Sequence, residues 1–346
     1  MHPGICNEVR DQSSCVLSRY ALGRDDGHVL KAPPTSMPRG QHLFFSSGDL
    51  IADRRYQYAR DLQARGDVEA AADLLAQAVE RAPAFAPAWF TLGDLHERGG
   101  DCVAAIAAFE RALAADPDDR RGARLRLARL GCGDAADAMS PAYVRAVFDQ
   151  HAADFDAALR DGLAYRGPEL LRAALARVIA AQSRPFRFHR ALDLGCGTGL
   201  MGGALQGAFD HMLGVDLSPG MIEAARRKGI YTELAVADML GSLGRQTSTA
   251  DLIVAADAFV YLADLTPVCR AAARVLSPGG LLAFTVETHE GPGVMLGETL
   301  RYAHSADHVC DALEQAALEI LEFECASKRT EAGVPVPGLV AVGARR

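Results

Sequence analysis

Between residues 49 and 130 the chain alternates large and small apolar residues at helical spacing. One set of such positions is Trp89, Leu92, Gly93, Ala105, Phe109, Ala112 and Pro117. A period of about 34 residues, counted back along the chain, leads to an equivalent set. That set is Tyr58, Ala59, Ala71, Leu75, Ala78 and Pro83. Because small residues on one helix admit large ones from its partner, and a proline ends the second helix, the pattern predicts two stacked helical pairs.

A third, partial unit is expected from Arg120 to Leu130. Five arginines lie in this segment, at 120, 121, 124, 126 and 129. We interpret them as a solvated helix face, with nucleic acid as the less favoured alternative.

The pattern changes after residue 130. Residues 131–140 are rich in Gly, Ala and Asp, which indicates a linker. Ser140-Pro141 is typical of a helix start, with Ser as the N-cap and Pro in the first turn. Apolar and aromatic residues follow at helical spacing, and again from Leu170 to Ala181. Core packing and a functional surface both remain open as the role of these aromatic side chains.

Beyond residue 190 the apolar residues gather in short runs separated by helical segments. The runs include 191–194, 212–215, 251–255, 281–286, 318–325 and 339–343. Short buried runs that alternate with helices indicate an α/β fold with a mainly parallel sheet. Residues 1–48, in contrast, have no sustained period and are rich in polar and turn-forming residues, which predicts a disordered tail. Met37 marks an alternative translation start within that tail.

Composition narrows the class of protein. The 346 residues include 36 Lys+Arg against 44 Asp+Glu, a net charge of −8. An acidic chain argues against nucleic acid or an anionic membrane as the partner, and no apolar run of about 18 residues is present to span a membrane. Because the first residues lack a signal-peptide run, a cytoplasmic location is expected. The eight cysteines form no C-x-x-C pair, so neither a disulfide framework nor a metal site is expected.

The most informative segment is 193–199, Asp-Leu-Gly-Cys-Gly-Thr-Gly, which lies between an apolar run and a helical segment. Glycines at such a place let the backbone approach a ligand closely. Asp216 follows Asp193 after 23 residues, and about 20 is the spacing of an acid that binds ribose hydroxyls. Asp238 follows after another 22 residues. A carboxylate at Asp193 would repel a diphosphate, whereas it attracts the cationic end of a cofactor.

Residues 193–199 resemble motif I of class I S-adenosylmethionine-dependent methyltransferases, and about 141–346 resembles that family as a whole. Residues 49–130 resemble tetratricopeptide repeats, so the chain is similar to bacterial predicted methyltransferases fused to such repeats. The resemblance implies S-adenosylmethionine as the cofactor. It also implies a Rossmann-like α/β fold, with a seven-stranded sheet whose last strand is antiparallel, preceded by a small all-α repeat module.

The implied domain limits are 1–48 for the tail, 49–130 for the repeats, 131–140 for the linker and 141–346 for the methyltransferase domain. A helical lid is expected at 141–189. The positions that the family pattern assigns to the cofactor are Tyr143, Arg166, Asp193, Gly195, Cys196, Gly197, Asp216, Leu217, Asp238, Met239, Ala255 and Ala256.

Five of these positions have particular roles in the resemblance. Asp216 would bind the ribose hydroxyls, Asp238 the adenine amino group and Arg166 the carboxylate of the cofactor. Ala255, together with Ala256, would offer backbone carbonyls to the ammonium. Each position also has a purely structural reading, as a turn glycine, a helix cap or a loop residue.

Methyl transfer needs a base only where the acceptor arrives protonated. The loops expected to overhang the methyl group carry Glu287 and His304, which we take as the candidate catalytic residues. A surface or supporting role is the alternative for each. Further titratable neighbours are His151, Asp257, Tyr261, His289, Arg301 and Tyr302.

The net charge of the predicted methyltransferase domain narrows the class of methyl acceptor. Residues 190–346 hold 12 Lys+Arg against 19 Asp+Glu, which disfavours a nucleic-acid substrate. Three hypotheses remain. The first is transfer to a small molecule, with the repeats as a protein-interaction or dimerisation module. The second is transfer to a protein or peptide that the repeats recruit, and the third is a non-catalytic scaffold that binds the cofactor.

Overall fold

The structure, a computed structural model, describes residues 46–156, 159, 164–331 and 333–346. It divides into two compact units, and the division falls between Ala146 and Val147, inside helix α7 (Pro141–His151). The predicted tail lies outside the described residues except for 46–48, and Met37 lies outside them too. The domain limits expected from the sequence stay a prediction.

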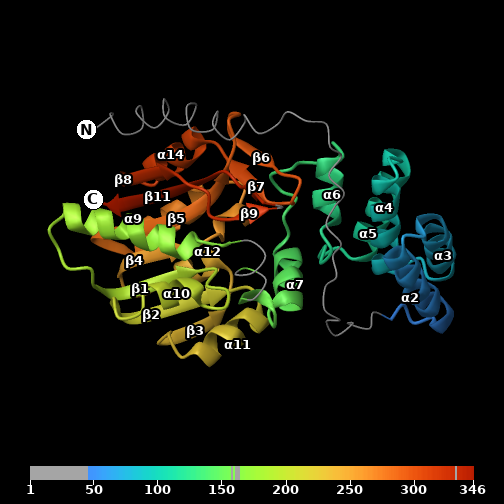
Figure 1. The fold of residues 1–346 in the computed structure, drawn as a ribbon, viewed down its shortest axis with the longest axis horizontal. Coiled ribbons are helices and arrows are strands. Elements are labelled where there is room, and N and C mark those ends of the chain that lie inside the picture. Colours follow the sequence, from blue (N-terminus) through green and yellow to red (C-terminus); the bar gives the residue numbers. More distant parts are fainter. Residues whose placement is uncertain (1–45, 157–158, 160–163, 332) are drawn as a thin grey trace. The chain divides into compact units, whose positions relative to one another are not determined.

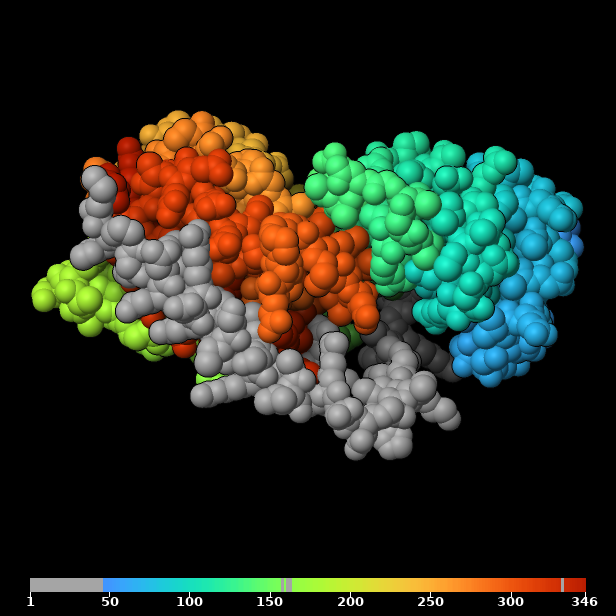
Figure 2. Space-filling model, turned by 90° about the horizontal axis from the view of Figure 1, so that it is seen from above, coloured from blue at the N-terminus to red at the C-terminus, as the bar shows by residue number. Residues whose placement is uncertain are grey.

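The described part of the first unit is built from helical pairs. Its helices are α2 (Leu50–Arg65), α3 (Val68–Arg81), α4 (Ala86–Arg98), α5 (Cys102–Ala115) and α6 (Ala123–Arg129). Each helix packs on the next along the chain, and on the face in Figure 2 the blue-to-green helices form one continuous surface. A Cβ on Gly93 would lie 2.8 Å from the ring of Phe109, so this glycine admits the large side chain as the repeat pattern predicts.

The interpretation of the arginine-rich segment as a solvated face is wrong for Arg126. Its side chain is only 19% exposed and pairs with Asp94 at 3.0 Å and with Glu97 at 3.1 Å. Arg129 also bonds to Glu97, at 3.1 Å. These partners lie on α4, so the arginines join the third unit to the second instead of facing solvent.

The second unit is built on a sheet with the strand order β3-β2-β1-β4-β5-β11-β8. The bounds of these strands are β1 (Phe188–Leu194), β2 (Phe209–Asp216), β3 (Glu233–Val236), β4 (Ala250–Ala255), β5 (Leu276–Thr288), β8 (Leu318–Cys325) and β11 (Gly338–Arg345). Pairing is parallel from β3 to β5, whereas β11 runs antiparallel to both β5 and β8. The predicted seven-stranded sheet with an antiparallel last strand is therefore confirmed.

Short strands extend this sheet and form a separate hairpin. Strand β7 (Tyr302–His304) pairs with the end of β5 and with β6 (Val294–Leu296). Strands β9 (Thr330–Glu331) and β10 (Val334–Pro335) pair with each other. The sequence pattern had predicted neither pair, because strands of two or three residues leave no measurable period.

Helices cover both faces of the sheet, as Figure 1 shows for α9 beside β5 and β11. The helices are α9 (Gly167–Ala181), α10 (Leu200–Ala204), α11 (Pro219–Lys228), α12 (Met239–Gly244), α13 (Thr266–Val275) and α14 (Ala306–Gln315), with a 3-10 turn at Phe259–Tyr261. One core cluster joins the sheet to α12, α13 and α14, and another joins it to α9 and α10. Over the described ranges, no helix is long and apolar enough to cross a membrane.

Candidate cofactor and acceptor site

The glycine-rich loop between β1 and α10 lies at the carboxyl end of the parallel strands. The amides of Gly195 and Cys196 donate to the carbonyl of Val215 on β2, at 2.8 and 2.9 Å. Gly195, Gly197 and Gly199 have φ values of +71°, +52° and +91°, in the region that favours glycine. A Cβ on Gly195 would lie 2.5 Å from the Cβ of Ala258, so the close approach of Ala258, three residues after the end of β4, also requires glycine at position 195. We call the ends of β1 and β2 the cofactor edge.

Asp193 is fully buried beneath this loop. Its Oδ2 accepts a hydrogen bond of 2.7 Å from the Tyr231 hydroxyl. Its Oδ1 is buried and has no hydrogen-bond partner among the described residues. Burial raises the pKa of Asp193 to about 7, although the Tyr231 hydrogen bond acts in the opposite direction. A cationic group fits beside such a carboxyl, because its charge would favour the ionised form.

Asp216 ends β2 next to the same loop. Its Oδ2 accepts from the amide of Gly197 at 2.9 Å, and its Oδ1 from the amide of Ser218 at 2.8 Å. Burial raises its pKa, against the effect of these two amides. Two amides leave free lone pairs on a carboxylate, so Asp216 keeps the capacity to accept from ribose hydroxyls. Leu217 follows it, half-buried.

The other expected cofactor positions on the sheet occupy neighbouring strand ends. Asp238 is exposed and caps α12 through the amide of Gly241, at 2.7 Å. Met239 is half-buried, and its methyl lies 3.6 Å from a Cβ built on Gly195. Ala255 and Ala256 lie at the end of β4.

The two cofactor positions expected in the lid, Tyr143 and Arg166, differ in their surroundings. Tyr143 belongs to the repeat unit, where its ring would lie 2.8 Å from a Cβ on Gly122. Arg166 is exposed at the start of α9, and its amide donates to the carbonyl of Lys328 at 2.7 Å. Their contacts with a cofactor stay a prediction.

The end of α7 and the segment that follows it contact the cofactor edge through two aspartates. Asp149 accepts from the Ser218 hydroxyl at 2.5 Å and from the Gly220 amide at 3.1 Å. Asp156 pairs with Lys228 at 2.6 Å and accepts a hydrogen bond from Thr198 in the glycine loop. Asp156 is thus bonded to the glycine loop itself, and Asp149 to the start of α11.

Aromatic contacts continue to the end of β4. Phe148 packs edge-on against Phe155 at 5.8 Å and against Tyr261 at 5.5 Å, both between ring centroids. Tyr165 is close enough to Asp257 and Asp193 to feel the charge of both carboxylates. Burial, together with these charges, raises the pKa of Tyr165 well above its usual value.

Five charged side chains meet at the carboxyl ends of β4 and β5, which we call the acceptor edge. They are Asp257, Glu287, Arg301, Lys328 and Arg329. Arg329 donates to Asp257 at 3.2 Å and to Glu287 at 2.6 Å, and Lys328 pairs with Asp257. Arg301 lies 3.6 Å from Glu287 and donates to the Tyr261 hydroxyl at 3.3 Å.

The two candidate bases differ in their surroundings. Glu287 belongs to this cluster, and its Oε1 contacts both Arg329 and Arg301. His304 is fully buried in β7, with its Nε2 2.8 Å from the carbonyl of Leu262, and burial lowers its pKa to about 4. A ring with no exposed surface does not reach an acceptor in this arrangement.

Lys328 and Arg329 are the residues that sequence reasoning missed. They follow β8 in a segment without a recognisable motif, and their side chains are only 1% exposed. The one available signal was two adjacent cations in an otherwise acidic region, Glu319 to Glu331.

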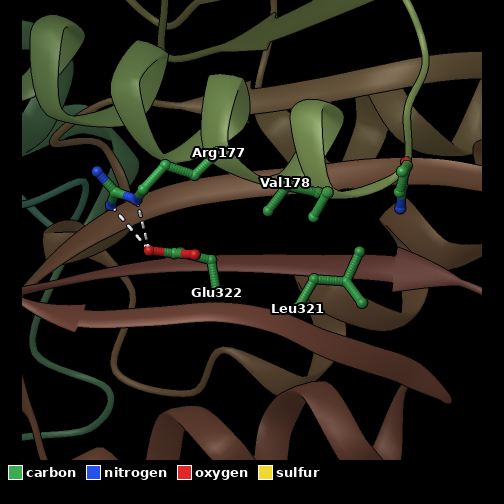
Figure 3. Close-up of a pocket in the computed structure, with 6 residues that line it drawn as sticks. Arg177, Val178, Leu321 and Glu322 are labelled. Atoms are coloured by element: carbon green, nitrogen blue, oxygen red, sulfur yellow. Dashed lines mark hydrogen bonds and ion pairs between the residues drawn. The ribbon is translucent and has the colours of Figure 1, made fainter.

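A small hollow of about 170 Å³ lies elsewhere, between α9 and β8. Figure 3 shows Arg177 bonded to Glu322 across it, beside Val178 and Leu321. The residues that line it belong to neither edge described above, so it does not extend the candidate site.

Comparisons with known proteins agree with this geometry. Residues 191–280 match the family model of a methyltransferase domain, and residues 56–120 match that of a tetratricopeptide repeat. The chain thus contains one segment similar to tetratricopeptide repeats and another similar to methyltransferase domains. The enzyme class and the cofactor expected from the sequence, S-adenosylmethionine-dependent methyltransferase and S-adenosylmethionine, agree with these matches.

Two curated relatives have related names. Human methyltransferase-like protein 27 is 34% identical over 183 residues, which are 49% of this chain and 66% of that protein. The ubiquinone biosynthesis O-methyltransferase of Xanthomonas oryzae pv. oryzae is 31% identical over 97 residues, 27% of this chain and 41% of that protein. The chain therefore spans less than two thirds of each relative.

Among solved structures, the chain is similar to the N-methyltransferase NodS from Bradyrhizobium japonicum in complex with S-adenosyl-L-homocysteine. The identity is 22%, with a TM-score of 0.44, over 58% of this chain and 98% of that chain. A methyltransferase from Clostridium acetobutylicum is 18% identical, with a TM-score of 0.43, over 57% of this chain and 98% of that chain.

Proposed function

We propose that the protein transfers a methyl group from S-adenosylmethionine to a small-molecule acceptor. The observation that carries the proposal is the cofactor edge, where left-handed glycines lie together with the fully buried carboxyl of Asp193 and the half-buried carboxylate of Asp216. Asp216 bonds to the amide of Gly197, and Asp193 lies directly beneath the loop. Such an edge suits a ligand with ribose hydroxyls and a cationic end.

When bound, the cofactor supplies an electrophilic methyl group on a sulfonium. The residues of this chain then have to bind the cofactor and the acceptor, orient them for transfer and exclude water from the site. We assign the ribose to Asp216 and Leu217, the adenine to Asp238 and Met239, and the methionine part to the glycine loop with Ala255 and Ala256. Arg166 and Tyr143 are assigned to the lid side.

The acceptor lies, in this proposal, against the acceptor edge. Glu287 is our candidate for a group that contacts it, whereas the burial of His304 favours a supporting role in β7. The name of the Xanthomonas relative, an O-methyltransferase of ubiquinone biosynthesis, supports a small molecule as the acceptor class.

A second candidate function is methylation of a protein that the repeats recruit. It is favoured by the two complete helical pairs α2–α3 and α4–α5, because stacked repeats commonly provide a binding surface for a partner. In the first candidate the same repeats bind a protein partner or a second copy of this chain.

One experiment tests both candidates with the full chain. The protein is incubated with cell extract and methyl-labelled S-adenosylmethionine, and the extract is then separated into small-molecule and protein fractions. Label in the small-molecule fraction supports the first candidate, and label in the protein fraction supports the second. Transfer should stop in Asp216→Ala. A wild-type protein that binds the cofactor but labels neither fraction would leave the non-catalytic scaffold as the better account.

A further inference from the structure

Tyr231 is the side chain on which the glycine loop, α10 and β2 converge. It lies between α11 and β3 (Figure 1). A Cβ built on Gly199, where the loop ends, would lie 2.9 Å from the Tyr231 ring. The corresponding distance is 2.6 Å for Gly202 in α10 and 2.9 Å for Gly214 in β2. Glycines on three different elements thus leave the room that this one ring occupies.

The register of the sheet directs the Tyr231 hydroxyl to Asp193. Gly214 on β2 is the partner of Asp193 on β1, so a ring that lies against Gly214 brings its hydroxyl to the carboxyl on the next strand. The hydroxyl donates to Asp193 Oδ2 at 2.7 Å. The next residue, Thr232, exchanges hydrogen bonds of 3.0 and 3.1 Å with Met212 on β2. Contacts with both strands therefore fix the place of the hydroxyl.

Asp193 keeps one oxygen available for a ligand. Its side chain is fully buried, and its Oδ1 has no hydrogen-bond partner within the part of the chain that the structure describes. Burial and the neighbouring carboxylate of Asp216 both raise its pKa, whereas the hydrogen bond from Tyr231 lowers it. Burial also raises the pKa of Tyr231 well above its usual value, although the backbone of Gly202 acts against it, so the hydroxyl stays protonated and can donate. Tyr231 thus favours the ionised carboxyl, which is the form that a cation attracts.

We propose that Tyr231 is a positioning residue for S-adenosylmethionine, whose hydroxyl fixes the Asp193 carboxylate beneath the cationic amino-acid end of the cofactor. The inference rests on the proposed function, because it requires that end of the cofactor to lie against the glycine loop. The two parts of the side chain have separable roles. The ring fills the space beside the loop, and the hydroxyl sets the orientation of Asp193.

The test compares the binding of two ligands to the full-length protein. S-adenosylmethionine has the cationic amino-acid end, whereas 5′-methylthioadenosine has the same ribose and adenine but neither the sulfonium nor the amino acid. Tyr231→Phe keeps the ring and removes the hydroxyl. We expect it to weaken S-adenosylmethionine binding about three- to tenfold, since the lost hydrogen bond reaches the ligand only through Asp193. The affinity for 5′-methylthioadenosine should stay within about twofold of the wild-type value. Titration calorimetry at one fixed pH measures both affinities.

A double-mutant cycle with Asp193→Asn tests whether the hydroxyl acts through Asp193. In the Asp193→Asn background, Tyr231→Phe should change the affinity for S-adenosylmethionine by less than about twofold, because the carboxylate that the hydroxyl orients is already absent. Losses that multiply in the double variant would overturn the inference. An equal loss of affinity for both ligands in Tyr231→Phe would also overturn it, since that result indicates a general disturbance of the loop.

Gly202→Ala is the second variant, should Tyr231→Phe fold poorly. Its Cβ would lie 2.6 Å from the Tyr231 hydroxyl oxygen, so it displaces the hydroxyl without changing the tyrosine. The same selective loss of S-adenosylmethionine affinity is expected. Gly203→Ala is the matched control in α10, because the nearest atom to its Cβ is Ile230 Cδ1 at 3.7 Å, an ordinary contact. Equal affinities of the two variants for S-adenosylmethionine would show the inference to be wrong.

Failure of the inference and failure of the proposed function are distinguishable in the same measurement. A wild-type protein that binds no S-adenosylmethionine would contradict the proposed function itself. A wild type that binds S-adenosylmethionine, together with a folded Tyr231→Phe variant that binds it equally tightly, would overturn only the positioning role of Tyr231.

Discussion

The cofactor edge and the acceptor edge of the same sheet are held together by different forces. At the cofactor edge, backbone amides bind carboxylates, as Gly197 binds Asp216, and the partners lie 19 residues apart. At the acceptor edge, side-chain charges bind one another, and Arg329 and Asp257 lie 72 residues apart. Backbone donors keep their charge state at any pH, whereas the ion pairs depend on every member of the cluster. The hydrogen bonds of the first edge therefore form within a short stretch of chain, whereas the second edge forms only when distant segments meet.

The largest effect is expected from Asp216→Ala, which removes the carboxylate of the cofactor edge. Loss of charged hydrogen bonds to two ribose hydroxyls should weaken S-adenosylmethionine binding at least about 100-fold, at roughly 1.5–3 kcal/mol for each bond. Calorimetry measures the affinity. Asp210→Ala is the control on the same strand, since Asp210 pairs with Arg187 and His189 away from the loop. Equal affinities for both variants would contradict the assignment.

The next effect concerns the backbone of the glycine loop. Gly195→Ala introduces a Cβ 2.5 Å from Ala258 at a φ of +71°. Gly207→Ala has a similar φ of +82° but open space around the new Cβ, so it isolates the conformational cost. We expect about 1 kcal/mol of destabilisation for Gly207→Ala and about 1–3 kcal/mol more for Gly195→Ala, from urea unfolding. Equal losses would show that contact with Ala258 is not limiting.

A smaller effect is expected in the pH dependence of stability, through the buried Asp193 carboxyl of the cofactor edge. Burial raises the pKa of Asp193 from its ordinary value of 3.8 to about 7 in the folded protein, so folding favours its protonated form. The stability that the protonated carboxyl allows is fully present below about pH 4. The free energy of unfolding then falls as the pH rises from about 4 to about 7. Asp193→Asn avoids the loss, so its free energy of unfolding relative to the wild type should rise between these values and then level off.

The control for Asp193→Asn is Asp210→Asn. His189 and Arg187 lower the pKa of Asp210, so its stabilising contribution appears above the pKa and is lost on acidification. The two variants should therefore change in opposite directions between about pH 3 and pH 7 when followed by urea unfolding. A parallel course for both would contradict the raised pKa that burial gives the Asp193 carboxyl.

The smallest effect is expected outside both edges. Arg177→Gln removes ion pairs to Glu322 and Glu324 in which the arginine side chain is 48% exposed. Exposed pairs contribute up to about 1 kcal/mol, and salt screens them. The change in unfolding free energy should stay below that value and shrink at high salt. A larger loss would indicate that the hollow beneath Arg177 contributes to packing.

Sequence reasoning predicted the fold because its signals are local. The alternation of apolar runs with helices, the glycine loop of 193–199 and the acid 23 residues later all lie within short windows. The repeat helices follow from the same kind of pattern, since Gly93 and Phe109 meet as the spacing predicts. The charged segment 120–130 shows the limit, because the partners of Arg126 lie on α4, about 30 residues earlier, at a distance in sequence that no period reveals.

The sequence by itself determined the class of fold, the repeat module and the glycine loop between β1 and α10, because periodicity and turn chemistry act over a few residues. Only the tertiary structure decided that His304 is buried in β7 and that Lys328 and Arg329 meet Asp257 and Glu287. Strand pairing between β5, β11 and β8 brings those segments together, and long-range pairing leaves no mark in the local pattern. The ionisation of the acceptor edge therefore depends on a meeting of side chains that exists only once the chain has folded.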